Sequence, residues 1–231
     1  MKISVVGASG RIGSKVVELL RSDGHDVVGS SRSSGVDVLT GDGLAAAVDG
    51  AHVLVDVTNA PGLGADAVMS FFTTSATNLV AAADAAGVGH YVALSIVGVD
   101  GLPDSGYMRA KVAQEKIITG SGIPYSIVRA TQFVEFTDAI VRSMTDGDVV
   151  RVPDALIQPI PSDDVAAAIA RAAVSKPVNG ILNIGGPEKI TFEQMARDVV
   201  RRDNRTESVV VDTGARYFGA TLATGSLVTP D

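Results

Sequence analysis

The stretch Ile3-Ser4-Val5-Val6-Gly7-Ala8-Ser9-Gly10-Arg11-Ile12-Gly13 carries the strongest fold signal in this chain. Its first four residues predict a buried strand, and residues 12–22 place apolar side chains at helical spacing. Glycine lets the backbone turn tightly and approach a phosphate, and the helix start adds free N–H groups and a positive dipole end. We therefore predict a dinucleotide-binding turn, with a purely structural glycine turn as the alternative. The predicted contacts are Gly7, Ser9, Gly10, Arg11, Ile12 and Gly13.

The composition excludes several classes of protein. The 231-residue chain is 46% hydrophobic and 19% charged, which argues against disorder. Its net charge of −7 argues against partners such as nucleic acid or an anionic membrane surface. Cysteine is absent and the three histidines show no ligand spacing, so we expect no disulfide and no metal site. With no signal-peptide core and no apolar run of membrane-spanning length, we expect a cytoplasmic protein.

Short apolar runs alternate with helical patterns along the chain, which is typical of a parallel sheet covered by helices on both faces. We predict six strands before about residue 130, at residues 3–6, 27–30, 36–39, 52–57, 91–95 and 125–128. The predicted fold is α/β, a Rossmann-type doubly wound parallel sheet. We expect one domain over residues 1–231, with a dinucleotide-binding core at about 1–130 and a small C-terminal α/β substrate lobe at about 131–231.

The end of the second strand selects between NAD and NADP in such folds. A carboxylate there would bind the ribose 2′-hydroxyl, but this chain has Ser30-Ser31-Arg32-Ser33-Ser34. An arginine pairs with a 2′-phosphate through two N–H groups, and Arg11 offers a second cation. We therefore predict that NADP(H) is preferred over NAD(H). The alternative for Arg32 is a solvated surface arginine.

Further cofactor contacts are expected beyond the carboxyl ends of the strands, where ligands of open α/β sheets bind. Asp42 and Gly43 follow the predicted third strand, and Thr58, Asn59 and Ala60 follow the fourth. Each segment has an ordinary turn as its alternative. After the sixth strand we expect further contacts to the cofactor, and a substrate pocket formed by Gln132, Phe133 and Phe136. The cofactor contacts expected there are Ala130, Thr131, Gln132 and Phe133.

Ser95 ends the predicted fifth strand, and Tyr107 and Lys111 open the next helix. The i, i+4 spacing puts Tyr107 and Lys111 on one helical face. An ammonium near a phenol lowers the pKa of the phenol, which suits it to pass a proton to a carbonyl oxygen. We predict Tyr107 as proton donor, Ser95 as a second donor to the same oxygen, and Lys111 as pKa tuner and ribose anchor. The alternative is a chance pairing on an amphipathic helix.

Other motifs lie at residues 93–100 (ALSIVGVD), 110–115 (AKVAQE), 127–133 (IVRATQF), 158–160 (QPI) and 185–188 (GGPE). With the glycine turn, Ser95 and the stretch Tyr107-Met108-Arg109-Ala110-Lys111, they resemble the atypical short-chain dehydrogenase/reductases, and more closely their NmrA-like NAD(P)-binding branch. The resemblance implies a Rossmann fold, a preference for NADP, and the family's Ser-Tyr-Lys group at Ser95, Tyr107 and Lys111.

The resemblance leaves two functions open. Many members of this branch lack the tyrosine, and some bind NADP as sensors without turnover. Because this chain keeps Tyr107 and Lys111, we predict an NADPH-dependent oxidoreductase that transfers hydride to a small carbonyl or quinone-like acceptor. The alternative is a redox sensor of the NmrA type. We expect a small-molecule substrate and a monomer or homodimer.

Overall fold

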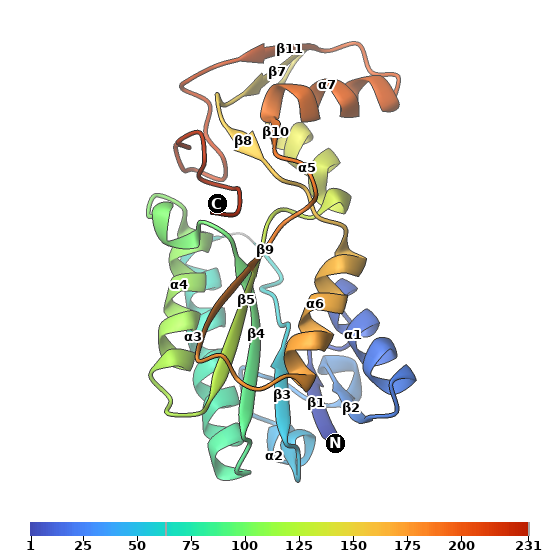
Figure 1. Cartoon of the computed structure of the whole chain (residues 1–231). Helices are drawn as coiled ribbons and strands as arrows, with labels where there is room; N and C mark the ends of the chain where they lie inside the picture. The colour runs from blue at the N-terminus through green and yellow to red at the C-terminus, as the bar shows by residue number, and fades with distance from the viewer. Residues whose placement is uncertain (63, 231) are drawn as a thin grey trace.

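The computed structural model describes residues 1–62 and 64–230, and it is built around a six-stranded parallel sheet (Figure 1). The strand order is β2-β1-β3-β4-β5-β9, which confirms the Rossmann-like α/β class. All neighbouring strands in it pair in parallel, so their carboxyl ends meet at one edge. The strands are β1 (Lys2–Val6), β2 (Asp26–Ser30), β3 (Val53–Asp56), β4 (His90–Ile96), β5 (Tyr125–Ala130) and β9 (Gly180–Ile184).

Helices cover both faces of this sheet. On one face α1 (Arg11–Ser22) packs beside α6 (Ser162–Val174), and on the other α3 (Ala65–Ala85) packs beside α4 (Gly106–Thr119). Two apolar clusters fill the spaces between helices and sheet. The central strands β1, β3, β4 and β5 are therefore buried on both sides, which explains their nearly continuous apolar sequences, whereas the edge strand β9 is largely exposed. The short helix α2 (Leu44–Val48) leads into β3.

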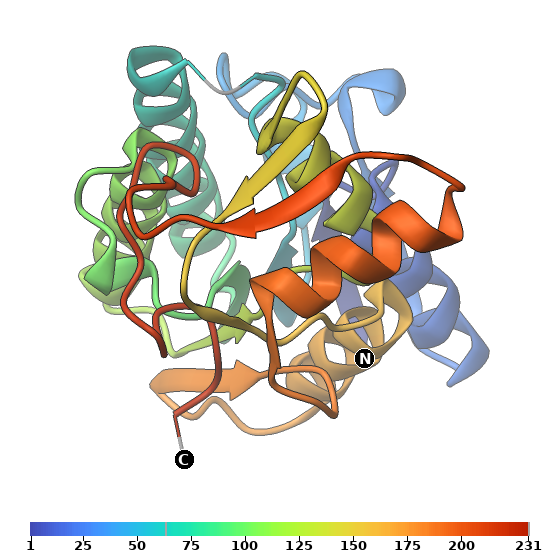
Figure 2. The same ribbon diagram turned by 90° about the horizontal axis from the view of Figure 1, so that it is seen from above.

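The C-terminal elements stand over the carboxyl edge of the sheet, as Figure 2 shows from above. They form a third apolar cluster centred on Ile157, Phe192 and Tyr217. Their strands make a three-stranded sheet, β11-β7-β6, and a two-stranded sheet, β10-β8. These elements are α5 (Thr137–Ser143), β6 (Thr145–Asp146), β7 (Val149–Val152), β8 (Leu156–Ile157), β10 (Ile190–Thr191), α7 (Phe192–Arg202) and β11 (Ser208–Val211). The described residues also include the short 3-10 turns η1 (Arg32–Ser34), η2 (Val99–Gly101) and η3 (Val134–Phe136).

One predicted strand is wrong. Residues 36 and 37 are irregular and residues 38–40 form a turn, because the Asp37 carboxylate accepts a hydrogen bond from Leu39 N at 2.8 Å and the Asp37 carbonyl accepts one from Gly41 N at 2.9 Å. The sixth strand of the sheet is instead β9, which pairs with β5. As a consequence, two elements from the region that we expected to form a C-terminal lobe belong to the Rossmann core. The strand β9 is part of its sheet, and the helix α6 covers one face of that sheet.

In the part of the chain that the structure describes, none of the helices has the length and apolar character needed to cross a membrane. The same residues contain no group of three or more His, Cys, Asp or Glu side chains placed to hold a metal ion.

Candidate active site

The glycine turn between β1 and α1 has no room for side chains at two positions. A Cβ on Gly7, whose φ is +93°, would lie 2.7 Å from the Val57 carbonyl oxygen, and one on Gly13 would lie 2.2 Å from the Gly7 carbonyl oxygen. Both distances are below any real contact of a Cβ atom. Gly10 is the N-cap of α1, where no side chain caps the helix. The first amides of α1 thus stay available, which is the arrangement that binds phosphate.

The other predicted residues of this turn differ in which of their atoms a ligand can reach. Ser9 and Arg11 are exposed, whereas the Ile12 side chain is buried in the core and leaves only its backbone for a ligand. Gly7 N and Ala8 N both donate to the Ser30 carbonyl at the end of β2, at 2.9 and 3.0 Å. The glycine turn therefore lies directly beside the segment that carries Arg32.

Arg32 begins the η1 turn after β2, and 63% of its side chain is exposed. Its Nε lies 3.4 Å from the Asp37 carboxylate, which holds the guanidinium near the sheet edge. Gly43 packs against the same turn, since a Cβ there would lie 2.6 Å from the Gly35 carbonyl oxygen. Asp42 is exposed and accepts a hydrogen bond from Thr40 Oγ1. The structure thus places Asp42 and Gly43 beside the predicted phosphate-binding arginine.

The residues after β5 lie next to the glycine turn. The Arg11 guanidinium sits over the Phe136 ring at 5.4 Å from its centroid, and the Phe133 ring stacks on Phe136 at 5.5 Å. Ala130 and Thr131 are buried, and Thr131 Oγ1 donates to the Gln158 carbonyl. Gln132 is only 8% exposed, and among the described residues its Oε1 has no hydrogen-bond partner.

Tyr107 on α4 and Asn59 after β3 are brought together by a hydrogen bond. The Tyr107 hydroxyl donates to Asn59 Oδ1 at 2.6 Å. Thr58, one residue earlier, is fixed by two bonds from its backbone N and Oγ1 to the buried Asp56 carboxylate. Ala60 is half-buried and packs against the core cluster. The segment 58–60 therefore faces α4, as a site at the carboxyl edge of the sheet requires.

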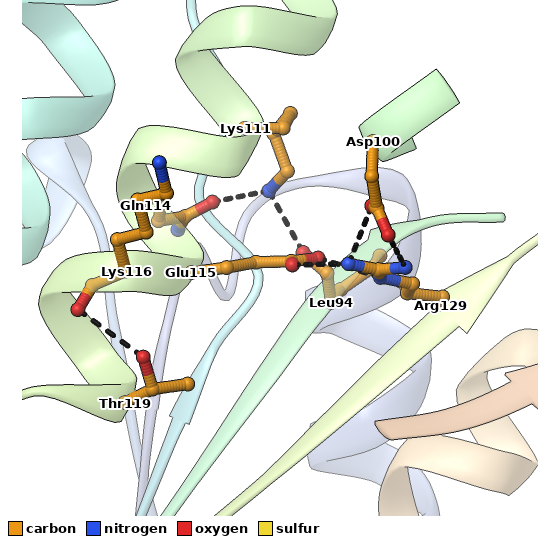
Figure 3. A network of polar contacts seen from close by, with 8 residues as sticks. All are labelled: Leu94, Asp100, Lys111, Gln114, Glu115, Lys116, Thr119 and Arg129. Carbon is orange, nitrogen blue, oxygen red and sulfur yellow. Dashed lines mark hydrogen bonds and ion pairs between the residues drawn. The ribbon is translucent and has the colours of Figure 1, made fainter. Parts of the chain in front are cut away.

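Lys111 lies on the same face of α4 as Tyr107, because both contact the Phe72 ring. Its ammonium donates to the Leu94 carbonyl at 2.8 Å and to Gln114 Oε1 (Figure 3). Burial lowers the pKa of Lys111 to about 8, although the carboxylates of Asp56 and Glu115 act in the opposite direction. The predicted lowering of the Tyr107 pKa is wrong for the free protein, since burial raises it to about 12.

Ser95 is buried on β4 in register with Arg129 of β5. Within the described residues its Oγ has no hydrogen-bond partner. A buried hydroxyl without a partner costs free energy, so such a group in a native site points to a ligand that completes it.

One residue of the site was missed from the sequence. Tyr217, on the C-terminal segment, is buried with its hydroxyl beside the Gln132 amide and near Tyr107. The sequence gives only a faint signal for it, an aromatic pair followed by glycine at residues 217–219.

A cavity of about 490 Å³ lies apart from these side chains. It is bounded by α6, β9 and residues 229–230, and Asp164, Arg171 and Asn183 are among its lining residues. Ser95, Tyr107 and Lys111 do not line it. The candidate active site is therefore the cluster at the ends of β3, β4 and β5, and this cavity is separate from it.

Comparison with known proteins agrees with this geometry. A family described as NAD(P)H-binding matches residues 7–176. A curated relative, the (4-alkanoyl-5-oxo-2,5-dihydrofuran-3-yl)methyl phosphate reductase of Streptomyces griseus subsp. griseus, is 30% identical over 229 residues. The alignment covers 91% of this chain and 78% of the relative.

Two solved structures resemble the fold at low identity. MoeE5 in complex with UDP-glucose and NAD is 19% identical with a TM-score of 0.73, over 95% of this chain and 87% of MoeE5. An NADPH-dependent quinone oxidoreductase of Escherichia coli is 20% identical with a TM-score of 0.66, over 92% of this chain and 78% of that enzyme. At such identities the two structures bear on the fold alone.

Proposed function

The chain belongs to the NAD(P)H-binding family, among the atypical, NmrA-like short-chain dehydrogenase/reductases, and is an oxidoreductase; from this premise we propose that it uses NADPH to reduce a small carbonyl or quinone-like acceptor. The observation that carries the proposal is the pair of hydroxyls at the sheet edge, on Tyr107 and on Ser95, which has no hydrogen-bond partner among the residues that the structure describes. The name of the Streptomyces griseus relative describes a reductase of an acylated dihydrofuranone, which supports a small acceptor that carries conjugated carbonyl groups. We also propose, as the sequence predicts, that the protein is cytoplasmic and that it is a monomer or a homodimer.

The glycine turn fits a dinucleotide, because Gly7 and Gly13 let strand, turn and helix pack closely while the first amides of α1 stay uncapped by any described side chain. We propose that the amides of Arg11 to Gly13 hold the pyrophosphate, since Gly10 N already donates to the Gly7 carbonyl at 3.0 Å, and that Arg32 and Arg11 attract the 2′-phosphate. The rim is completed by Ser9, Asp42, Gly43, Thr58, Asn59 and Ala60, and after β5 by Ala130, Thr131, Gln132 and Phe133.

NADPH supplies the hydride when it is bound. In the proposal Tyr107 gives its hydroxyl proton to the oxygen of the acceptor, and Ser95 donates a hydrogen bond to the same oxygen. Lys111, held under Tyr107 by Leu94 and Gln114, anchors the nicotinamide ribose. The aromatic rings of Phe133 and Phe136 form an apolar rim that helps to keep water from the acceptor.

The cofactor preference depends on Arg32. We expect Arg32→Ala to weaken NADPH binding about tenfold while NADH binding changes less than about twofold, since only NADPH carries the 2′-phosphate. Dissociation constants from fluorescence titration of both cofactors check this. Arg201→Ala, an exposed arginine on α7, is the control and leaves both constants unchanged. Equal losses for NADPH and NADH would contradict the assignment.

The proton donor is tested with Tyr107→Phe. With aldehydes and ketones we expect kcat to fall about a hundredfold at unchanged NADPH affinity, because the variant keeps the ring but has no proton to give. Quinones, which accept hydride without an obligate acid, should lose less. Steady-state NADPH oxidation over a panel of quinones, aldehydes and ketones is the measurement, with Tyr125→Phe as the matched control at the far end of β5.

The sensor function is the second candidate. The hydrogen bond from Tyr107 to Asn59, and the burial that raises the Tyr107 pKa to about 12, favour it. The same acceptor panel separates the two functions. Tight NADP binding without turnover of any acceptor would support the sensor and reject the reductase.

A further inference from the structure

The C-terminal segment covers the ends of β4 and the start of α4. A Cβ on Gly98, just after β4, would lie 1.9 Å from the Ser226 carbonyl oxygen, so the two backbones are in direct contact. A Cβ on Gly219 would lie 3.9 Å from the Asp104 carbonyl oxygen, in the loop before α4. Figure 1 shows this segment lying above α4. Residues 216–226 therefore lie over the strand that carries Ser95 and the helix that carries Tyr107.

A strained turn holds Tyr217 in this cover. Tyr217 N donates to the Ala220 carbonyl at 2.8 Å and Ala220 N donates to the Tyr217 carbonyl at 3.0 Å, which closes a two-residue turn. Phe218 and Gly219 both have positive φ, 45° and 86°. Asparagine or glycine ordinarily fills the first of these positions, and a phenylalanine there is an outlier. Such strain is retained where the surrounding structure needs the conformation.

The turn buries the Tyr217 ring and gives its hydroxyl a defined place. The ring packs edge-on against Phe192 at 5.9 Å and against Phe218 at 4.7 Å between centroids. The hydroxyl lies within hydrogen-bonding reach of the Gln132 side chain and near Tyr107. Gln132 Oε1 is buried and lacks a partner among the described residues. An unpartnered amide oxygen accepts a hydrogen bond, so the ligand that completes it must bring an N–H or O–H.

We propose that Tyr217 and Gln132 form a hydrogen-bonding pair that selects acceptors with a hydroxyl on the carbon next to the reducible carbonyl. Gln132 Oε1 accepts from that hydroxyl, and the Tyr217 hydroxyl donates to its oxygen. The orphaned Ser95 hydroxyl and Tyr107 are left for the carbonyl oxygen itself. The inference rests on the proposed reductase function and adds the class of substrate, an α-hydroxy ketone or aldehyde. A site built around a substrate hydroxyl discriminates strongly against the analogue that lacks it.

The test compares hydroxyacetone with butan-2-one, which has a methyl group in place of the hydroxyl. Dissociation constants are measured by ligand-observed NMR on the full chain saturated with NADP⁺, so turnover is not required. We expect hydroxyacetone to bind the native protein about tenfold more tightly. Tyr217→Phe, which keeps the packed ring, and Gln132→Met, which keeps the chain length, should each reduce this preference to within about twofold. Tyr125→Phe should retain it.

A native protein that binds both ketones equally overturns the inference, as does a Tyr217→Phe variant that keeps the full preference. If Tyr217→Phe does not fold, Gln132→Met alone decides the matter in the same way. Failure of the proposed reductase is seen separately, as the absence of NADPH oxidation with either ketone and with the quinone and aldehyde panel. The preference for hydroxyacetone over butan-2-one can therefore be measured whether or not the protein reduces either ketone.

Discussion

Glu115→Ala is expected to destabilise the protein by about 3–5 kcal/mol, because it leaves a buried guanidinium without its main partner. Arg129 and Glu115 are joined by two parallel bonds, Nε to Oε1 at 2.9 Å and Nη2 to Oε2 at 2.6 Å, and about a tenth of each side chain is exposed (Figure 3). For a chain of this length the loss corresponds to a fall of about 10 °C in the melting temperature.

The same arginine provides the control. Asp100 also binds Arg129, at 2.7 Å, but 63% of its side chain is exposed. Water can replace an exposed carboxylate, so Asp100→Ala should cost less than about 1 kcal/mol. Thermal unfolding followed by circular dichroism measures both variants. If Glu115→Ala melts no lower than Asp100→Ala, the buried pair does not stabilise the protein as argued.

The ion pair also bears on the site. Glu115 lies one turn after Lys111 on α4, and Arg129 lies on β5, in register with Ser95 of β4. The pair therefore fixes the helix that carries Tyr107 and Lys111 against the strands at the carboxyl edge. A Glu115→Ala variant studied below its melting temperature should consequently also lose part of its turnover.

Most strands and helices were predictable because their apolar residues follow a regular spacing. The error at residues 36–39 shows the limit of this signal. Val36 and Val38 are both buried, so they alternate as in a strand, but the Asp37 carboxylate and the glycines at 41 and 43 make a turn. The pairing of β9 with β5 depends on contacts far apart in the sequence, which no local pattern encodes.

The site was predictable where chemistry follows spacing, and less so where it depends on packing. The i, i+4 spacing correctly put Tyr107 and Lys111 on one face, since both contact Phe72. The pKa of Tyr107 depends instead on what surrounds it, and the Lys111 ammonium is directed to the Leu94 carbonyl and Gln114. Tyr217 could not be placed from the sequence, because its position is set by a long excursion of the chain back over the sheet.

Gly13→Ala is expected to weaken NADPH binding more than about a thousandfold, because the added methyl group meets backbone atoms that cannot move independently. Its Cβ would lie 2.2 Å from the Gly7 carbonyl oxygen, 2.7 Å from the Gly7 carbonyl carbon and 2.8 Å from the Ala8 Cα. Relief of these contacts requires α1 to move away from the turn. The helix amides and the turn amides then no longer converge on one phosphate.

Helix propensity alone predicts the opposite sign, since alanine in a helix is more favourable than glycine by about 1 kcal/mol. A loss of NADPH affinity in Gly13→Ala must therefore come from the backbone clash, because the substitution by itself favours the helix. Gly10→Ala is the graded control, because its nearest contact is the Gly7 carbonyl oxygen at 3.2 Å, where a shift of a few tenths of an ångström suffices. NADPH fluorescence titration should rank the affinities as native, then Gly10→Ala, then Gly13→Ala. A folded Gly13→Ala protein that binds NADPH as well as Gly10→Ala would show that the turn and the helix do not hold the cofactor together.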